Sequence, residues 1–128
     1  MKQPVQATLL RIFTDETARG DEQPLFEEIV RKAQDAHLAG ATVLRGPLGF
    51  GRSGVLHTEK ILRLSYDLPV VIEIIDSDEK IQEFLPQLAS FEDCVVTLAD
   101  VQMFRLDRAE TAGSSPSHAA GRPPTIGD

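Results

Sequence analysis

The sequence contains one cysteine, no tryptophan and one tyrosine in 128 residues. Because Cys94 is the only cysteine, the chain cannot form an internal disulfide, and we expect a reducing, cytoplasmic location. No apolar run approaches the roughly 20 residues of a membrane-spanning helix, and the N-terminus lacks the apolar stretch of a signal peptide. We therefore expect neither a membrane span nor secretion.

Positive charge is also scarce, with 13 lysines and arginines against 20 aspartates and glutamates and a formal net charge of -7. Nucleic-acid binding generally needs a basic face, so we expect no nucleic-acid partner. After Asp107 the composition shifts to alanine, glycine, serine and proline, as in "AETAGSSPSHAAGRPPTIGD". We therefore predict one domain at residues 1–106 and a disordered C-terminal tail at residues 107–128.

Runs of apolar and β-branched residues predict strands. They lie at residues 5–13, 41–46, 69–76 and 94–106, with a further short candidate at 61–65. Two amphipathic segments, residues 24–40 and 76–91, predict helices.

The predicted helix ends rest on capping signals. Pro24 suits the start of the first helix and Gly40 its end, and we expect His37 to complement the helix dipole. The spacing of Asp76 and Glu79 predicts a capping box for the second helix. Pro86 should kink or split that helix, because proline removes a backbone hydrogen bond.

The element order β-α-β-β-α-β is typical of the α+β ferredoxin-like fold, a four-stranded antiparallel sheet with both helices on one face. In the strand at residues 69–76, Val70, Ile72 and Ile74 should face one side and Val71 and Ile75 the other. Since helices on one side leave the other face bare, these apolar residues predict self-association.

The stretch "GPLGFGRSGVLHTEK", residues 46–60, holds four glycines. Gly46 to Ser53 matches a phosphate-binding P-loop with arginine in place of lysine, and Gly49 to Gly54 matches a dinucleotide fingerprint. Both motifs require a following helix that the sequence does not predict, and arginine is not equivalent to lysine in a P-loop. A third interpretation is a flexible hairpin loop whose glycines only serve positive φ angles.

Phosphate binding is nevertheless favoured by the charges around this loop. Arg45, Arg52 and Lys60 concentrate positive charge in an acidic protein, and glycines let backbone N–H groups converge on an anion. A metal site is disfavoured at His57, which has no paired histidine or cysteine nearby.

The segment "GATVLRGPLGFGRSGVLHTEK" resembles the loop region of the PII signalling proteins, whose pattern runs G-x-T-V, then G-F-G-R-Q, then G-H-T-E. The chain from Leu9 to Arg105 more closely resembles the PII-like "domain of unknown function 190" family, notably in "HTEKILRLSYDLPVVIEIIDSDEKIQEFLP" and "VTLADVQMFR". This resemblance implies a PII-like homotrimer with inward-facing sheets and nucleotide effectors in clefts between subunits. It also implies a mobile loop that signals to a partner, for example a membrane transporter or channel or an enzyme.

The resemblance also implies individual roles. The glycine-rich motif and Arg52 would hold phosphates, Thr42 would contact adenine, and Arg105 would reach a neighbouring subunit's nucleotide. Ser53 replaces the glutamine that helps bind magnesium and 2-oxoglutarate, so AMP, ADP or a cyclic nucleotide is expected rather than ATP with 2-oxoglutarate. The predicted nucleotide-binding residues are Thr42, Gly49, Phe50, Gly51, Arg52, Ser53, His57 and Arg105.

We therefore expect a non-enzymatic, nucleotide-sensing regulator with no catalytic residues. The alternatives are a nucleotide hydrolase or phosphotransferase with a degenerate P-loop, and a trimer that responds to divalent metal. Two carboxylate pairs carry no predicted chemistry: Asp15 and Glu16 are interpreted as a solvated loop, and Glu27 and Glu28 as the first turn of a helix.

Overall fold

The computed structural model describes residues 3–51, 54, 56–58, 68–92 and 94–106. Its main sheet contains the strands β1 (Val5–Asp15), β2 (Ala41–Arg45), β5 (Pro69–Asp76) and β6 (Val95–Met103). The strand order is β2-β5-β1-β6, and all three pairings are antiparallel. With helices after β1 and after β5, this is the predicted α+β ferredoxin-like arrangement.

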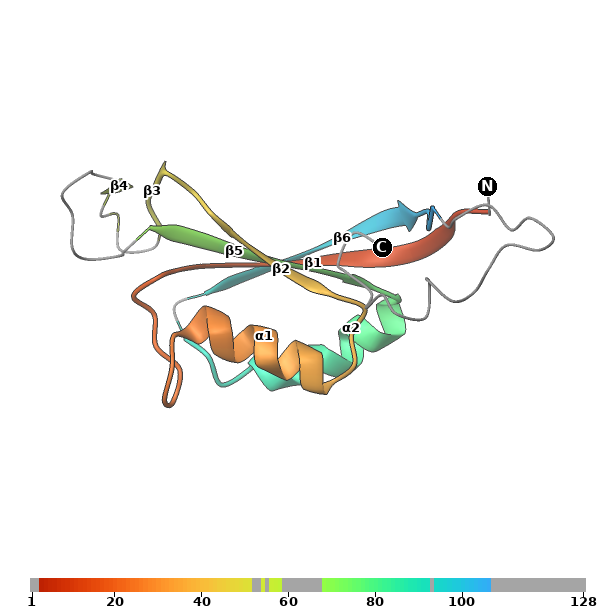
Figure 1. The fold of residues 1–128 in the computed structure, drawn as a ribbon, viewed down its shortest axis with the longest axis horizontal. Helices are drawn as coiled ribbons and strands as arrows, with labels where there is room; N and C mark the ends of the chain where they lie inside the picture. Colours follow the sequence, from red (N-terminus) through yellow and green to blue (C-terminus); the bar gives the residue numbers. More distant parts are fainter. Residues whose placement is uncertain (1–2, 52–53, 55, 59–67, 93, 107–128) are drawn as a thin grey trace, which may run out of the picture.

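Both helices, α1 (Leu25–Asp35) and α2 (Asp78–Phe84), cover the same face of the sheet (Figure 1). The core lies between the sheet and this helical layer. Its fully buried members alternate along the strands and recur at three- and four-residue spacing along the helices, as the sequence pattern predicts. They include Leu10, Ile12, Ile29, Ile72, Ile74, Ile81 and Phe84. Each such side chain contributes about 1.5–3 kcal/mol through burial.

No element among the described residues covers the opposite face of the sheet (Figure 1). An apolar row crosses it from β2 to β6, because Leu44 pairs with Val71, Val71 with Phe13, and Phe13 with Val95. Three of its members are solvent-exposed: Leu44, Phe13 and Val95. The predicted uncovered apolar face is therefore confirmed for one chain, whereas self-association remains a prediction.

The first helix ends earlier than predicted, at Asp35 rather than near Gly40. His37 adopts φ of 59°, and its N–H and that of Leu38 bond back to the carbonyl oxygens of Gln34 and Ala33 at 3.0 and 3.1 Å. These two bonds define a Schellman motif, in which a left-handed residue stops the helix. His37 therefore forms the helix stop, which the sequence pattern did not predict and which brings Leu38 onto the core. The predicted interaction of His37 with the helix dipole stays a prediction.

The second helix also starts differently from the prediction. Ser77 is the N-cap, and its hydroxyl accepts a 3.3 Å hydrogen bond from the Lys80 N–H. The predicted capping box is wrong, because the Asp76 carboxylate instead accepts the Ala39 N–H at 2.9 Å. The predicted break at Pro86 is confirmed, since α2 ends at Phe84 and a 3₁₀ helix spans Leu85–Leu88.

Within the described ranges, no helix is long and apolar enough to cross a membrane. The predicted short strand at residues 61–65 and the predicted disordered tail at residues 107–128 lie outside the described residues.

Candidate functional site

The glycine-rich loop leaves the main sheet where β2 ends at Arg45 and rejoins it where β5 begins at Pro69. Inside the loop, β3 (Leu48–Gly49) pairs antiparallel with β4 (His57–Thr58). Figure 1 shows this small hairpin beyond one end of the main sheet. A hairpin is only one of the alternatives that the sequence allows here, and the sequence pattern does not predict these two strands.

The glycines of the loop have two different structural roles. A Cβ atom on Gly46 or Gly49 would lie 3.1 Å from Cγ of Pro69, so glycine permits close packing on the proline ring. A Cβ atom on Gly51 would meet no atom of the described residues within 4 Å, and Gly54 adopts φ of 76°. Space is therefore open beside Gly51 and Gly54, although the Gly54 N–H already donates a 2.9 Å hydrogen bond to the Gly51 carbonyl, whereas Gly46 and Gly49 serve packing.

The surrounding topology differs from both nucleotide-binding motifs that the sequence imitates. A P-loop and a dinucleotide fingerprint each join a strand of a parallel sheet to a long helix. Here β2 pairs antiparallel with β5, and the next described element after Gly54 is β4 rather than a helix. The described chain therefore has neither architecture around residues 46–54.

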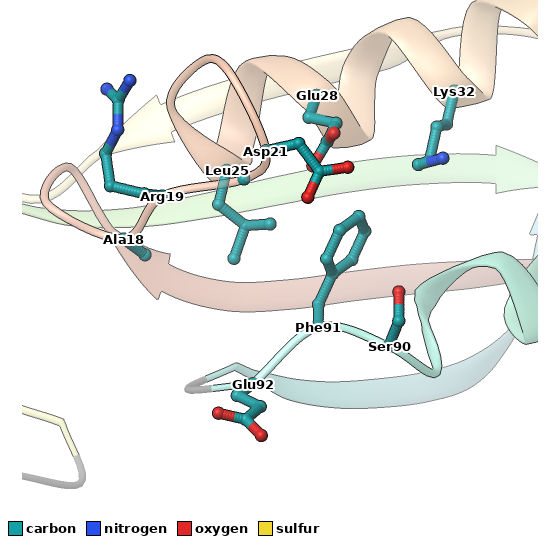
Figure 2. A pocket seen from close by; sticks show the side chains of 10 residues that line it. Ala18, Arg19, Asp21, Leu25, Glu28, Lys32, Ser90, Phe91 and Glu92 are labelled. Atoms are coloured by element: carbon teal, nitrogen blue, oxygen red, sulfur yellow. The ribbon is translucent and has the colours of Figure 1, made fainter.

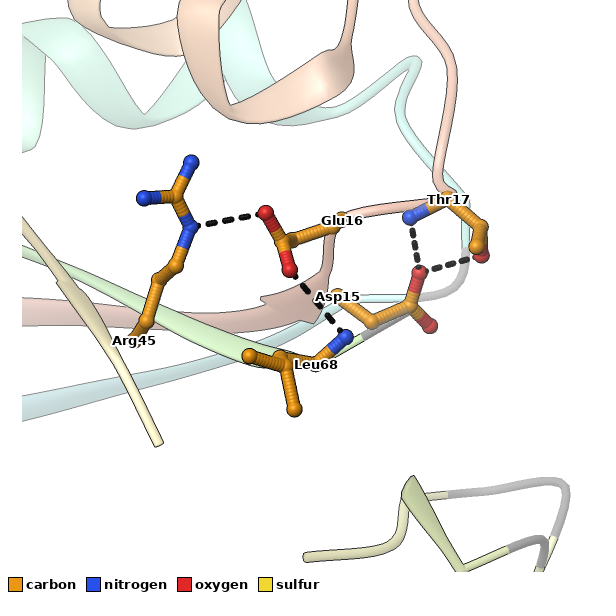
Figure 3. Close-up of polar contacts among 5 residues, drawn as sticks. All are labelled: Asp15, Glu16, Thr17, Arg45 and Leu68. Atoms are coloured by element: carbon orange, nitrogen blue, oxygen red, sulfur yellow. Dashed lines mark hydrogen bonds and ion pairs between the residues drawn. The ribbon is translucent and has the colours of Figure 1, made fainter. Parts of the chain in front are cut away.

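A buried carboxylate clamps the base of the loop (Figure 3). One oxygen of Glu16 accepts a 2.7 Å hydrogen bond from Nε of Arg45, and the other accepts the Leu68 N–H at 3.3 Å. The Glu16 N–H donates to the Leu68 carbonyl at 3.0 Å, and the Gly46 N–H donates to the Pro69 carbonyl at 2.9 Å. Both ends of the loop are thereby joined to the segment that follows β1.

This arrangement corrects the interpretation of Asp15 and Glu16 as a solvated loop. The Glu16 side chain is only 6% exposed. Asp15 shapes the same turn, because one carboxylate oxygen accepts the Thr17 and Ala18 N–H groups at 2.8 and 2.9 Å. No single-sequence signal identifies the clamp, since Glu16 and Arg45 are 29 positions apart.

The clamp also changes the predicted positive cluster of Arg45, Arg52 and Lys60. Glu16 offsets the charge of Arg45, although the arginine side chain remains 58% exposed. Arg52 and Lys60 lie outside the described residues, as does Ser53.

The described members of the predicted site fall into separate groups. Phe50 is 71% exposed and next to Gly51, and His57 pairs with Gly49 across the small hairpin. Thr42 lies on the uncovered sheet face opposite Glu73, whose carboxylate accepts a 2.8 Å hydrogen bond from Arg11.

Arg105 lies at the other end of the sheet from the loop. It follows the end of β6, where Met103 pairs with Val5, whereas the loop is at the end where Val95 pairs with Phe13. Figure 1 shows these two ends far apart. One chain therefore cannot bring Arg105 to the glycine-rich loop.

Metal-ligating side chains do not converge in the described part of the chain, where no group of three or more His, Cys, Asp or Glu could hold a metal ion.

Comparison with known proteins identifies the family. The profile of the "domain of unknown function 190" family, described as "Uncharacterized ACR", matches residues 7–103. The chain belongs to this family. Two UPF0166 proteins of Aquifex aeolicus are similar to it. One is 37% identical over 102 residues, which cover 80% of this chain and 97% of that protein. The other is 35% identical over 101 residues, which cover 78% of this chain and 99% of that protein.

Solved structures show that this member of the family has a PII-like fold. One is CPII, a nitrogen regulatory PII-like protein from Thiomonas intermedia, bound to ADP, AMP and bicarbonate. It superposes with a TM-score of 0.60 at 18% identity, over 80% of this chain and 92% of that chain. Another, from Thermus thermophilus and described as PII-like, has a TM-score of 0.58 at 16% identity, over 80% of this chain and 93% of that chain.

Proposed function

We propose that this protein is a non-enzymatic, PII-like regulator that binds an adenine nucleotide and signals through a loop near residues 50–60. The expected effectors are AMP, ADP or a cyclic nucleotide. The observation that carries the proposal is the open space beside Gly51 and Gly54, the glycines that flank Arg52 in the sequence, in a loop whose base is clamped by Glu16. The shared fold with CPII, which is bound to ADP and AMP, supports the choice of nucleotide.

The proposed site needs more than one copy of the chain. Gly51 and Arg52 would hold phosphate at one end of the sheet, whereas Arg105 lies at the other end and would come from a neighbouring subunit. The uncovered apolar face supplies a surface on which copies can associate. A homotrimer with nucleotide clefts between subunits, as the family resemblance implies, accommodates both features.

The signalling target belongs to the same proposal. Phe50 is 71% exposed on the loop, and an exposed aromatic side chain is a typical anchor for a protein partner. A membrane transporter or channel, or an enzyme, is the expected class of target. Nucleotide binding at the base of the loop would then change the position in which the loop offers Phe50 to the partner protein.

Titration calorimetry with AMP, ADP, ATP and cyclic AMP tests the proposal. Arg52→Ala should weaken nucleotide binding by about 10- to 150-fold, because hydrogen bonds to charged groups contribute about 1.5–3 kcal/mol. Arg52→Lys should recover only part of the affinity, since the planar guanidinium is lost. Arg31→Ala is the matched control, because this arginine pairs with Glu27 on the exposed surface of α1.

Equal nucleotide affinity of wild type and Arg52→Ala would show that the loop is not the phosphate site. Release of phosphate from ATP by the wild type would favour the hydrolase alternative. Binding of copper or zinc without nucleotide would favour a metal-responsive protein.

A further inference from the structure

A second candidate site lies under α1, away from the glycine-rich loop. It is a pocket of about 340 Å³ between α1, the turn before it and the segment after the 3₁₀ helix (Figure 2). Leu25 and Phe91 give it an apolar wall, and its charged lining residues are Arg19, Asp21, Glu28, Lys32 and Glu92. Of residues 46–58, none that the structure describes lines it.

The Glu28 carboxylate in this pocket is incompletely satisfied. Its Oε2 atom is buried and has no hydrogen-bond partner among the described residues. The carboxylate packs against Gly20 so closely that a Cβ atom at that position would overlap it. A buried charged oxygen without a donor is costly, so the site favours a ligand that supplies one.

Lys32 presents the complementary group one helical turn later. Its Nζ lies 6.0 Å from the centroid of the Phe91 ring, and no carboxylate in the described chain pairs with it. Glutamate four residues before a basic residue usually forms an ion pair on a helix. The adjacent Glu27 and Arg31 do so at 3.2 Å, whereas Glu28 and Lys32, with the same spacing, do not.

We infer that this pocket binds a small zwitterion, a compound with both an ammonium and a carboxylate group such as a free amino acid. The ammonium would donate to Glu28, and the carboxylate of Asp21 also lines the pocket (Figure 2). The ligand carboxylate would accept from Lys32, and its apolar part would pack against Leu25 and Phe91. A ligand with one charge would pair with only one of Glu28 and Lys32.

The pocket and the nucleotide site are independent proposals. Because no described residue of the loop lines the pocket, the proposed zwitterion binding involves neither Arg52 nor a nucleotide. Either binding proposal can therefore be wrong while the other holds, and titration of each ligand alone distinguishes these outcomes.

The test begins with a thermal-shift screen of the full chain against the standard amino acids. At least one should raise the melting temperature, and calorimetry should show that its decarboxylated amine and its deaminated acid bind at least about tenfold more weakly. Glu28→Gln and Lys32→Met should each weaken binding by about 10- to 150-fold, as expected for a lost charged hydrogen bond. Glu27→Gln and Arg31→Met are matched controls with the same helical spacing outside the pocket, and their affinities should not change.

Three results would overturn the inference. One is the absence of any stabilisation by an amino acid, with or without ADP. A second is an amine that binds as tightly as its parent amino acid, which would indicate a simple cation site. A third is equal weakening by the pocket variants and the controls. Because Lys32 is not part of the core, Lys32→Met keeps the test valid if Glu28→Gln does not fold.

Discussion

Glu16 and Arg45 are joined across the base of the loop by a 2.7 Å hydrogen bond between Oε2 and Nε. Glu16 follows β1, a central strand of the sheet, and Arg45 ends the edge strand β2. The pair therefore ties the start of the loop to the most constrained part of the fold. The other oxygen of Glu16 holds the returning chain at Leu68.

Replacing Glu16 by glutamine should loosen this base. Glu16→Gln keeps the shape of the side chain but removes its charge, and charge-assisted hydrogen bonds are about twice as strong as neutral ones. We expect a loss of about 1 kcal/mol in the free energy of unfolding, because Arg45 is largely exposed and its interaction is screened. Urea denaturation measures this loss, and limited proteolysis should cut the loop faster. The exposed Glu22→Gln is the control, and an equal effect of both variants would contradict the role of the clamp.

Substitutions at Gly49 and at Gly51 should have different effects, the first on stability and the second on nucleotide affinity. Gly49→Ala places a methyl group against the Pro69 ring and should lower the melting temperature. Gly51→Val meets no neighbouring atom in the described chain, so its stability should remain near that of wild type while its nucleotide affinity falls. Thermal melts and calorimetry on the same samples distinguish the two. Normal nucleotide affinity of Gly51→Val would argue against ligand approach at that backbone.

His37 should respond to substitution in opposite directions. A left-handed φ costs a non-glycine residue about 1–2 kcal/mol, and glycine at this position would avoid that cost. Glycine would also raise the conformational entropy of the unfolded chain, which offsets part of the stabilisation. His37→Gly should therefore stabilise the protein by about 0.5–1 kcal/mol, whereas the β-branched His37→Val should destabilise it by about 1 kcal/mol. Gly40→Ala is the comparison in chemical denaturation, because Gly40 does not have a positive φ.

The uncovered sheet face should be the surface of self-association. Light scattering of the wild type should give about three times the chain mass of 14.0 kDa. Ile75→Asp, at a position that is 40% exposed on this face, should reduce the measured mass to that of one chain. Gln87→Asp, on the exposed surface of the 3₁₀ helix, should keep the wild-type mass. A monomeric wild type at micromolar concentration would rule out the intersubunit site as well.

Truncation should leave the domain intact. Residues 107–128 contain few apolar side chains, so we expect their deletion to change neither melting temperature nor nucleotide affinity. A drop of several degrees in the melting temperature of the shortened chain would show that the tail contributes to stability.

The sheet and its covered face were predictable because burial imposes a period of two. Val70, Ile72 and Ile74 alternate with less buried residues along β5, and this pattern is present in the sequence itself. Pro86 was equally informative, since the missing N–H has a local effect that does not depend on tertiary context.

Helix ends and polar contacts were less predictable because they depend on competition between nearby candidates. Gly40 is the usual type of residue at a helix end, yet the packing of Leu38 places the left-handed position at His37. Asp76 and Ser77 are both good N-caps, and the Ala39 N–H engages the first of them. Pairs such as Glu16 with Arg45 join distant segments, and spacing within one sequence carries no information about them.

Because hydrogen bonds hold both ends of the loop, its length can vary at little cost in stability. Contacts of Arg45, Gly46, Leu68 and Pro69 hold the two ends together. For ends already fixed, the entropy of closing a loop rises only with the logarithm of its length, by about 0.6 kcal/mol for each doubling. Insertions or deletions between residues 50 and 67 should therefore change the stability of the domain very little. Relatives could then acquire loops of different length, and different targets, without altering the core that carries them.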